Sequence, residues 1–67
     1  MDNTREIDAC REALRLAPED TVMLYTLAVA YASSGNMTEA WELQERLDRI
    51  DPSGALHLSA DIREFAR

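Results

Sequence analysis

Two residues have side chains that commonly perform nucleophilic catalysis or bind a transition metal: the only cysteine, Cys10, and the only histidine, His57. Cys10 falls on the apolar stripe of a predicted helix, where a free cysteine usually packs as a small hydrophobic residue. His57 has no recognisable carboxylate partner, and neither an HExxH nor a CxxC pattern occurs. One cysteine and one histidine also exclude an internal disulfide and a zinc site within one chain. The sequence therefore predicts no catalytic, cofactor or metal site and no enzymatic activity.

Carboxylates recur at every third residue in one later stretch, at Glu39, Glu42, Glu45 and Asp48. Such a row could bind a cation or supply an acid and a base. The same spacing also suits the solvated face of a helix, with Glu42 and Glu45 close to Arg46 and Arg49. Pairs four residues apart stabilise a helix by about 0.2 to 0.5 kcal/mol each. We favour the solvated face.

The charge balance narrows the classes of partner. Thirteen acidic residues stand against seven basic ones, all arginine, and the net charge is −6. This balance disfavours binding to nucleic acid and to anionic membranes. The N-terminal sequence does not have the pattern of a signal peptide, and the longest apolar run, residues 22–32, is too short to span a bilayer. We expect a soluble, cytoplasmic protein.

The elements that must position these residues are predicted to be four helices. The first should run from residue 4 to about 17, capped by Asn3 or Thr4 and ended by Pro18. Its apolar stripe consists of Ile7, Cys10, Ala13 or Leu14, and Ala17.

Three further helices follow. The second should span residues 21–34 with Asp20 as its N-cap, and the third residues 37–50. Between them Gly35 can take the positive φ that ends a helix, and Asn36 with Glu39 is typical of a capping box. The fourth is expected to begin at Ser53 or Gly54, after the third has ended.

An internal repeat is visible once the prolines are compared. Pro18 and Pro52 lie 34 residues apart, and the segments before them, EALRLAP and RLDRIDP, align. The unit over residues 21–52 carries apolar, small or turn residues at Leu24, Leu27, Ala28, Tyr31, Gly35, Met37, Ala40 and Pro52. With this period, these residues resemble the tetratricopeptide repeat family. The chain departs from the family pattern at Gln44, Leu47 and Asp61, where that family favours an aromatic residue, alanine and leucine.

The resemblance implies an all-α fold, a fragment of an α-solenoid built from antiparallel helix-turn-helix units. Residues 4–17 would be half a repeat, residues 21–52 a complete repeat, and residues 54–66 a closing helix. Fewer repeats are present than the three or so that such stacks normally need. We therefore expect association with another chain.

The second predicted helix is apolar around most of its circumference, which is typical of a helix buried on more than one side. One face should meet the first and third helices. The other face holds Val22, Tyr25, Val29 and Ser33. The resemblance implies that this face lines a concave surface for a peptide or helix of a partner protein. A clamp for a terminal carboxylate is not expected, because the chain has no lysine.

Two alternatives stay open for that face. The closing helix could cover it through Leu58, Ile62 and Phe65, or a second copy of the chain could do so. Ile7, Cys10 and Leu14 are further candidates for self-association, since the first helix would lack a neighbour on one side. Trp41 is expected to pack within the stack, although tryptophan is frequent at binding hot spots.

The sequence thus favours a non-catalytic protein–protein interaction module that binds a peptide or helix through an apolar helical face. The alternative is a self-assembling, homo-oligomeric scaffold. A helix-turn-helix nucleic-acid binder is the remote alternative, because Glu39, Glu42 and Glu45 occupy the helix that would enter the groove of DNA. We expect no cofactor, nucleic-acid or membrane partner.

Overall fold

The computed structural model describes residues 4–67, so the cap proposed at Asn3 lies outside the described residues. Within this range the chain is all-α and forms four helices: α1 (Thr4–Leu16), α2 (Thr21–Ser33), α3 (Met37–Ile50) and α4 (Pro52–Phe65). This confirms the predicted class and the predicted order of helices. The bounds of α1, α2 and α3 agree with those predicted to within one residue.

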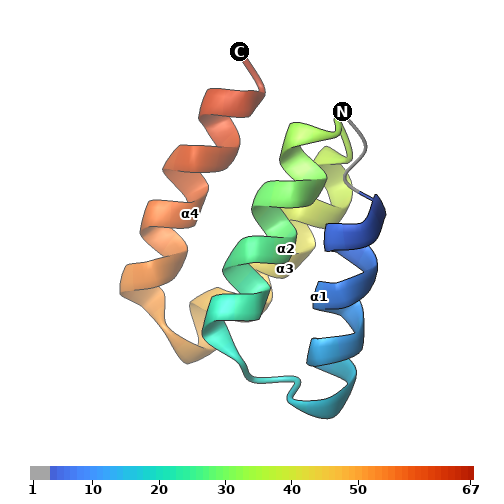
Figure 1. The fold of residues 1–67 in the computed structure, drawn as a ribbon. Coiled ribbons are helices and arrows are strands. Elements are labelled where there is room, and N and C mark those ends of the chain that lie inside the picture. Colours follow the sequence, from blue (N-terminus) through green and yellow to red (C-terminus); the bar gives the residue numbers. More distant parts are fainter. Residues whose placement is uncertain (1–3) are drawn as a thin grey trace.

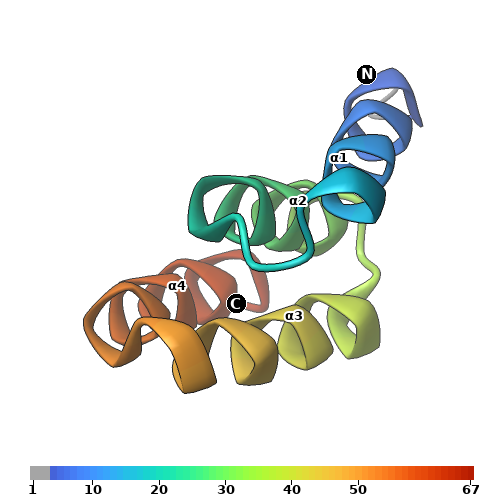
Figure 2. The ribbon, with the colours of Figure 1, turned by 90° about the horizontal axis from the view of Figure 1, so that it is seen from below.

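Successive helices run antiparallel, so that α1 and α3 point one way and α2 and α4 the other (Figure 1). We call the end near Pro18 and Pro52 the proline end and the end near Gly35 the glycine end. α2 packs against all three other helices, and α3 and α4 also pack against each other. Of the described helices, α1 packs against α2 alone and lies apart from α3 (Figure 2).

The core lies where α2, α3 and α4 meet. Its largest fully buried side chains, each at most 1% exposed, are Leu24, Leu47, Leu58 and Ile62. Burying one such side chain contributes about 1.5 to 3 kcal/mol. α1 adds Cys10 and Leu14 to the same apolar cluster.

Two departures from the tetratricopeptide pattern have clear structural roles. Leu47 is 1% exposed and fills the core where the pattern has alanine. Gln44 stands in place of an aromatic residue and reaches across to α4, where its Nε2 donates a hydrogen bond of 3.3 Å to the carbonyl of Ala55. Gln44 therefore forms a polar contact between α3 and α4.

The N-cap of α2 and the glycine that follows this helix are as predicted from the sequence. Asp20 caps α2 as predicted, because its carboxylate accepts from the amides of Val22 and Met23 at 3.1 and 3.2 Å. Gly35 has a φ of 90°, the left-handed conformation expected of it.

The predicted capping box between Asn36 and Glu39 is wrong. The Asn36 amide donates to the carbonyl of Tyr31 at 2.8 Å, so it does not need Glu39. The Asn36 side chain makes no cap hydrogen bond to α3. Its Nδ2 instead donates to Ser34 Oγ at 3.3 Å.

α4 begins at Pro52, before the predicted start at Ser53 or Gly54. Asp51 ends α3 and caps α4 at once: its amide donates to the Leu47 carbonyl at 2.7 Å, and its carboxylate accepts from the Gly54 amide at 3.1 Å. Proline is well tolerated at the first position of a helix, where the missing N–H would have no intrahelical partner. Pro52 therefore opens a helix, whereas Pro18 lies in the connection between α1 and α2.

Candidate functional site

The structure does not bring the two chemically active residues together. Cys10 is 5% exposed on α1, and burial, followed by the nearby Glu6 carboxylate, raises the pKa of its thiol. His57 is exposed on α4, a helix that does not pack against α1. Within residues 4–67, no group of three or more His, Cys, Asp or Glu residues is placed to hold a metal ion. Cys10 is therefore a packing residue.

The carboxylates of α3 are exposed, as expected of a solvated face: Glu39, Glu42, Glu45 and Asp48. The predicted pairing with Arg46 and Arg49 is wrong. The ion pairs that the described part of the chain forms are Arg15 with Glu12 at 2.6 Å and Arg67 with Glu64 at 3.2 Å, and both are exposed to solvent.

α4 covers part of the predicted partner-binding face of α2 and leaves the two ends of this face exposed. Val22 is 63% exposed. Tyr25 and Val29 are half-buried and pack against the core. Ser33 is exposed, and its Oγ donates to the carbonyl of Ala30 at 3.0 Å.

α4 covers this face of α2 in part, which was one of the two alternatives left open by the sequence. Leu58 and Ile62 are fully buried, whereas Phe65 is 47% exposed. The Tyr25 hydroxyl donates a hydrogen bond to the Asp61 carboxylate of α4. This hydrogen bond, together with burial and the charge of Asp61, raises the pKa of Tyr25 to about 12. The centre of the predicted binding face is thus a contact between α2 and α4.

The self-association candidates on α1 are mostly covered by the chain itself. Cys10 and Leu14 are 5% and 7% exposed, and Ile7 is half-buried. The open side expected for this stripe is therefore small. Trp41 is half-buried and packs against the core, in agreement with the expectation of packing within the stack.

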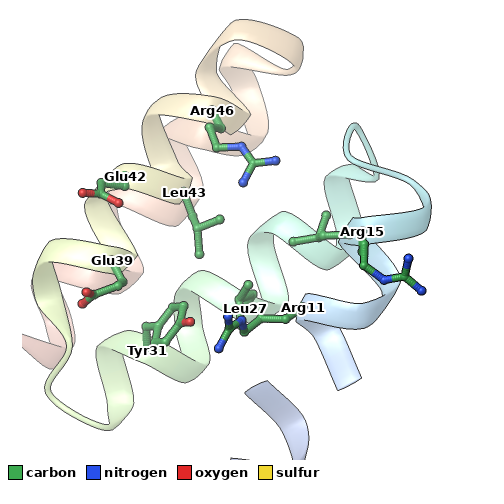
Figure 3. Close-up of a pocket in the computed structure, with 9 residues that line it drawn as sticks. Arg11, Arg15, Leu27, Tyr31, Glu39, Glu42, Leu43 and Arg46 are labelled. Atoms are coloured by element: carbon green, nitrogen blue, oxygen red, sulfur yellow. The ribbon is translucent and has the colours of Figure 1, made fainter. Parts of the chain in front are cut away.

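A groove lies between α1 and α3, which both pack on α2 without packing on each other. Its volume is about 350 Å³. Figure 3 shows Leu27, Tyr31 and Leu43 between the charged side chains of α3 and those of α1. The lining residues are Arg11, Leu14, Arg15, Leu27, Tyr31, Glu39, Glu42, Leu43 and Arg46.

The floor of the α1–α3 groove offers little apolar surface. Leu14, Leu27 and Leu43 are 7%, 3% and 6% exposed, so only their outer edges reach the groove, and Tyr31 is half-buried. The rims are exposed charged side chains. A ligand in this groove would meet a narrow apolar strip between charged walls.

Most of the exposed large apolar side chains lie in helix turns at the proline end of the stack. Of the five large hydrophobic residues that are exposed among residues 4–67, four lie there: Leu16, Val22, Ile50 and Leu56. They form two pairs related by the 34-residue period, Leu16 with Ile50 and Val22 with Leu56. A shallow recess of about 260 Å³, lined in part by Val22, Tyr25 and Gly54, opens at this end.

Comparison of the chain with protein-family models, with curated proteins and with solved structures finds no match. Within residues 4–67, none of the helices combines the length and the apolar character needed to cross a bilayer.

Sequence reasoning missed two features of the surface. It noted Asp61 only as a departure from the repeat pattern, whereas Asp61 is the partner of Tyr25. It did not identify the α1–α3 groove, whose lining residues come from three helices. The signal available for the groove was the presence of arginines on the polar sides of the first and third predicted helices, at Arg11, Arg15 and Arg46.

Proposed function

We propose that this chain is a non-catalytic protein-binding module of the tetratricopeptide type that its sequence resembles, and that the α1–α3 groove binds a helix of another protein. The groove itself carries the proposal. It is open to solvent, lies between α1 and α3, and combines an apolar strip, to which α1, α2 and α3 all contribute, with charged rims. Binding an amphipathic helix in such a groove is a recurring mode of recognition.

This proposal moves the binding surface away from the one expected from the sequence. Tyr25 is held by Asp61, and Val29 is half-buried, so a partner on that face of α2 would compete with α4. In the α1–α3 groove, Tyr31 is half-buried, whereas the lining leucines are nearly buried, so Tyr31 is the apolar side chain that a partner could cover.

Selection from a displayed library of helical peptides tests the proposal. We expect enriched peptides whose binding is lost in Tyr31→Ala, on the groove floor, and kept in Val22→Ala, on the exposed start of α2. Helical circular dichroism should show that both variants stay folded. Peptides that bind Tyr31→Ala but not Val22→Ala would place the site at the start of α2, outside the groove, and a library without enrichment would contradict the proposal.

Self-association is the second candidate function, and the apolar proline end favours it. An apolar surface shared by several elements often marks an interface. Sedimentation equilibrium over a wide concentration range measures the native mass. If this function is right, Leu16→Ser with Leu56→Ser lowers the mass, and Phe65→Ser, at the glycine end, leaves it unchanged. A wild-type monomer at high concentration contradicts it.

No observation favours the helix-turn-helix alternative. The exposed face of α3 carries Glu39, Glu42 and Glu45, which would repel the phosphate backbone.

A further inference from the structure

The charges of the α1–α3 groove are separated along its length. α1 and α3 both run from the glycine end to the proline end (Figure 1). Glu39 lies in the first turn of α3, at the glycine end. Arg15 lies in the last turn of α1, at the proline end. Arg46 is also at the proline end, since it donates to the carbonyl of Pro18 at 3.4 Å. Among the lining residues, Glu39 therefore lies nearest the glycine end and Arg15 and Arg46 nearest the proline end, with Arg11 and Glu42 one turn before Arg15 and Arg46.

Three of the seven arginines line this groove although the chain has a net charge of −6. Arg15 is paired with Glu12 on its own helix. Arg11 and Arg46 form no ion pair within residues 4–67. A guanidinium group presents five donors, so each of these side chains keeps hydrogen-bonding capacity toward a ligand.

Charge, more than apolar contact, must select the partner at this site. The leucines of the floor are nearly buried, so the apolar strip discriminates weakly between partners. At physiological salt the Debye length is about 8 Å, so the charges lining the groove act on a ligand more strongly than distant charges do. Complementary charges fix orientation and exclude wrong partners more effectively than they raise affinity.

We propose that the α1–α3 groove takes an amphipathic helix whose charge is separated in the same way. Its apolar stripe covers Tyr31, its acidic end faces Arg15 and Arg46, and its basic end faces Glu39 and Glu42. This occupant rests on the proposed function, because it names the partner of that site. A partner that is acidic throughout fits less well, since its far end would meet the two glutamates.

Two synthetic peptides provide the test. Both are helical and carry the same leucine stripe; one has glutamates in its first half and lysines in its second half, and the other has these halves exchanged. A helix has a direction, so the two peptides are not equivalent in the groove. We expect fluorescence anisotropy to show at least a tenfold difference in Kd between them. The peptides enriched from the displayed library should share the charge order of the tighter binder.

Charge reversal in the protein supplies the matched comparison. Arg15→Glu with Arg46→Glu should weaken the tighter peptide at least tenfold, and Glu39→Lys with Glu42→Lys should weaken it as well. Combining the four substitutions should reverse the preference between the two peptides. Arg5→Glu with Arg63→Glu changes the net charge by as much as the first pair, outside the lining of the groove, and should alter Kd less than twofold.

The outcomes separate this inference from the proposed function. The inference is overturned, and the function left standing, by library peptides that depend on Tyr31 but share no charge order. The same holds for peptides that bind the Arg15→Glu, Arg46→Glu variant as tightly as the wild type. Equal losses in that variant and in the Arg5→Glu, Arg63→Glu control also overturn it. Absence of any peptide that depends on Tyr31 overturns both.

Discussion

At the scale of single residues, the hydrogen bond from Tyr25 to Asp61 gives a measurable titration. Asp61→Asn removes the charge that favours the protonated phenol, so the pKa of Tyr25 should fall from about 12 toward its ordinary value of 10.0. Ultraviolet absorbance of the phenolate, in a Tyr31→Phe background where Tyr25 is the only tyrosine, follows this shift. An unchanged titration in Asp61→Asn would show that the two side chains do not interact in solution.

The same hydrogen bond predicts how stability depends on pH. The folded state holds the phenol proton more tightly than the unfolded state, so the contribution of Tyr25 is present in full below about pH 10 and is lost as the pH rises toward 12. Urea unfolding should show the free energy of unfolding of the wild type falling toward that of Tyr25→Phe across this window. Parallel curves for the two proteins contradict the prediction.

Cys10 should behave as a protected thiol. It is 5% exposed, and burial and Glu6 raise its pKa, which lowers the thiolate fraction at neutral pH. We expect a disulfide reagent to modify Cys10 much more slowly than a free cysteine-containing peptide, and the rate to rise as urea opens the fold. Equal rates for the native chain and the peptide would place Cys10 at the surface.

At the scale of the helices, Asp51 and Gly54 form a coupled pair at the start of α4. A Cβ added to Gly54 would lie 2.5 Å from Asp51 Oδ2, so Gly54→Ala must displace the capping carboxylate. The cap is worth about 1 kcal/mol, and replacing glycine by alanine within a helix gains up to about 1 kcal/mol. Gly54→Ala should therefore be nearly neutral in the wild type and stabilising by up to about 1 kcal/mol in Asp51→Ala. A double-mutant cycle by urea unfolding measures this coupling, and additive effects contradict it.

The turn between α2 and α3 depends on one glycine. Gly35 has a φ of 90°, and the space beside it is open, so a substitution there meets backbone strain and no steric clash. Gly35→Ala should cost about 1 to 2 kcal/mol of unfolding free energy. Gly35→Asn should cost less, because asparagine adopts this conformation more readily. Equal losses in the two variants would point to a cause other than φ.

Much of the fold follows from local sequence, and its exceptions have physical causes. Asp20 and Gly35 act as predicted because capping and positive φ are decided by near neighbours. The start of α4 was misplaced because the period equates Pro52 with Pro18, whereas a proline can either lie in a connection or open a helix. The order Asp51, Pro52, Ser53 contains the cap signal. The capping box predicted at Asn36 does not form, because the Asn36 amide donates to the Tyr31 carbonyl instead of to the Glu39 side chain.

At the scale of the whole molecule, packing is uneven. α2, α3 and α4 each pack against the other two, whereas α1 packs against α2 alone. Local opening follows the number of contacts that must break, so the amides of α1 should exchange with solvent deuterium faster than those at the centre of α2. Native-state hydrogen exchange measures both sets. Equal protection of α1 and α2 would show that the chain opens only as one unit.

The candidate site could be predicted from sequence only where it depends on one helix. The exposure of Val22 and Ser33 follows from their position at the two ends of α2. The α1–α3 groove depends on two helices that flank a third without packing on each other, and no helical periodicity contains that arrangement. From the local sequence alone, one would expect only solvent-exposed charges on helices at Arg15, Arg46 and Glu39. Their separation along one groove appears only when α1 and α3 are both placed on α2.

α1 forms one wall of the groove and is attached to the rest of the molecule through α2 alone. α3 packs against two helices, whereas α1 packs against α2 alone, so fewer contacts between helices hold α1 in position. A ligand that touches both walls must hold α1 in place, and its binding energy is then shared with the folding of α1. If the proposed partner binds the groove, its affinity and the protection of the α1 amides from exchange should therefore rise and fall together. A substitution at Cys10, which packs in the core and does not line the groove, should therefore weaken binding of the proposed partner indirectly.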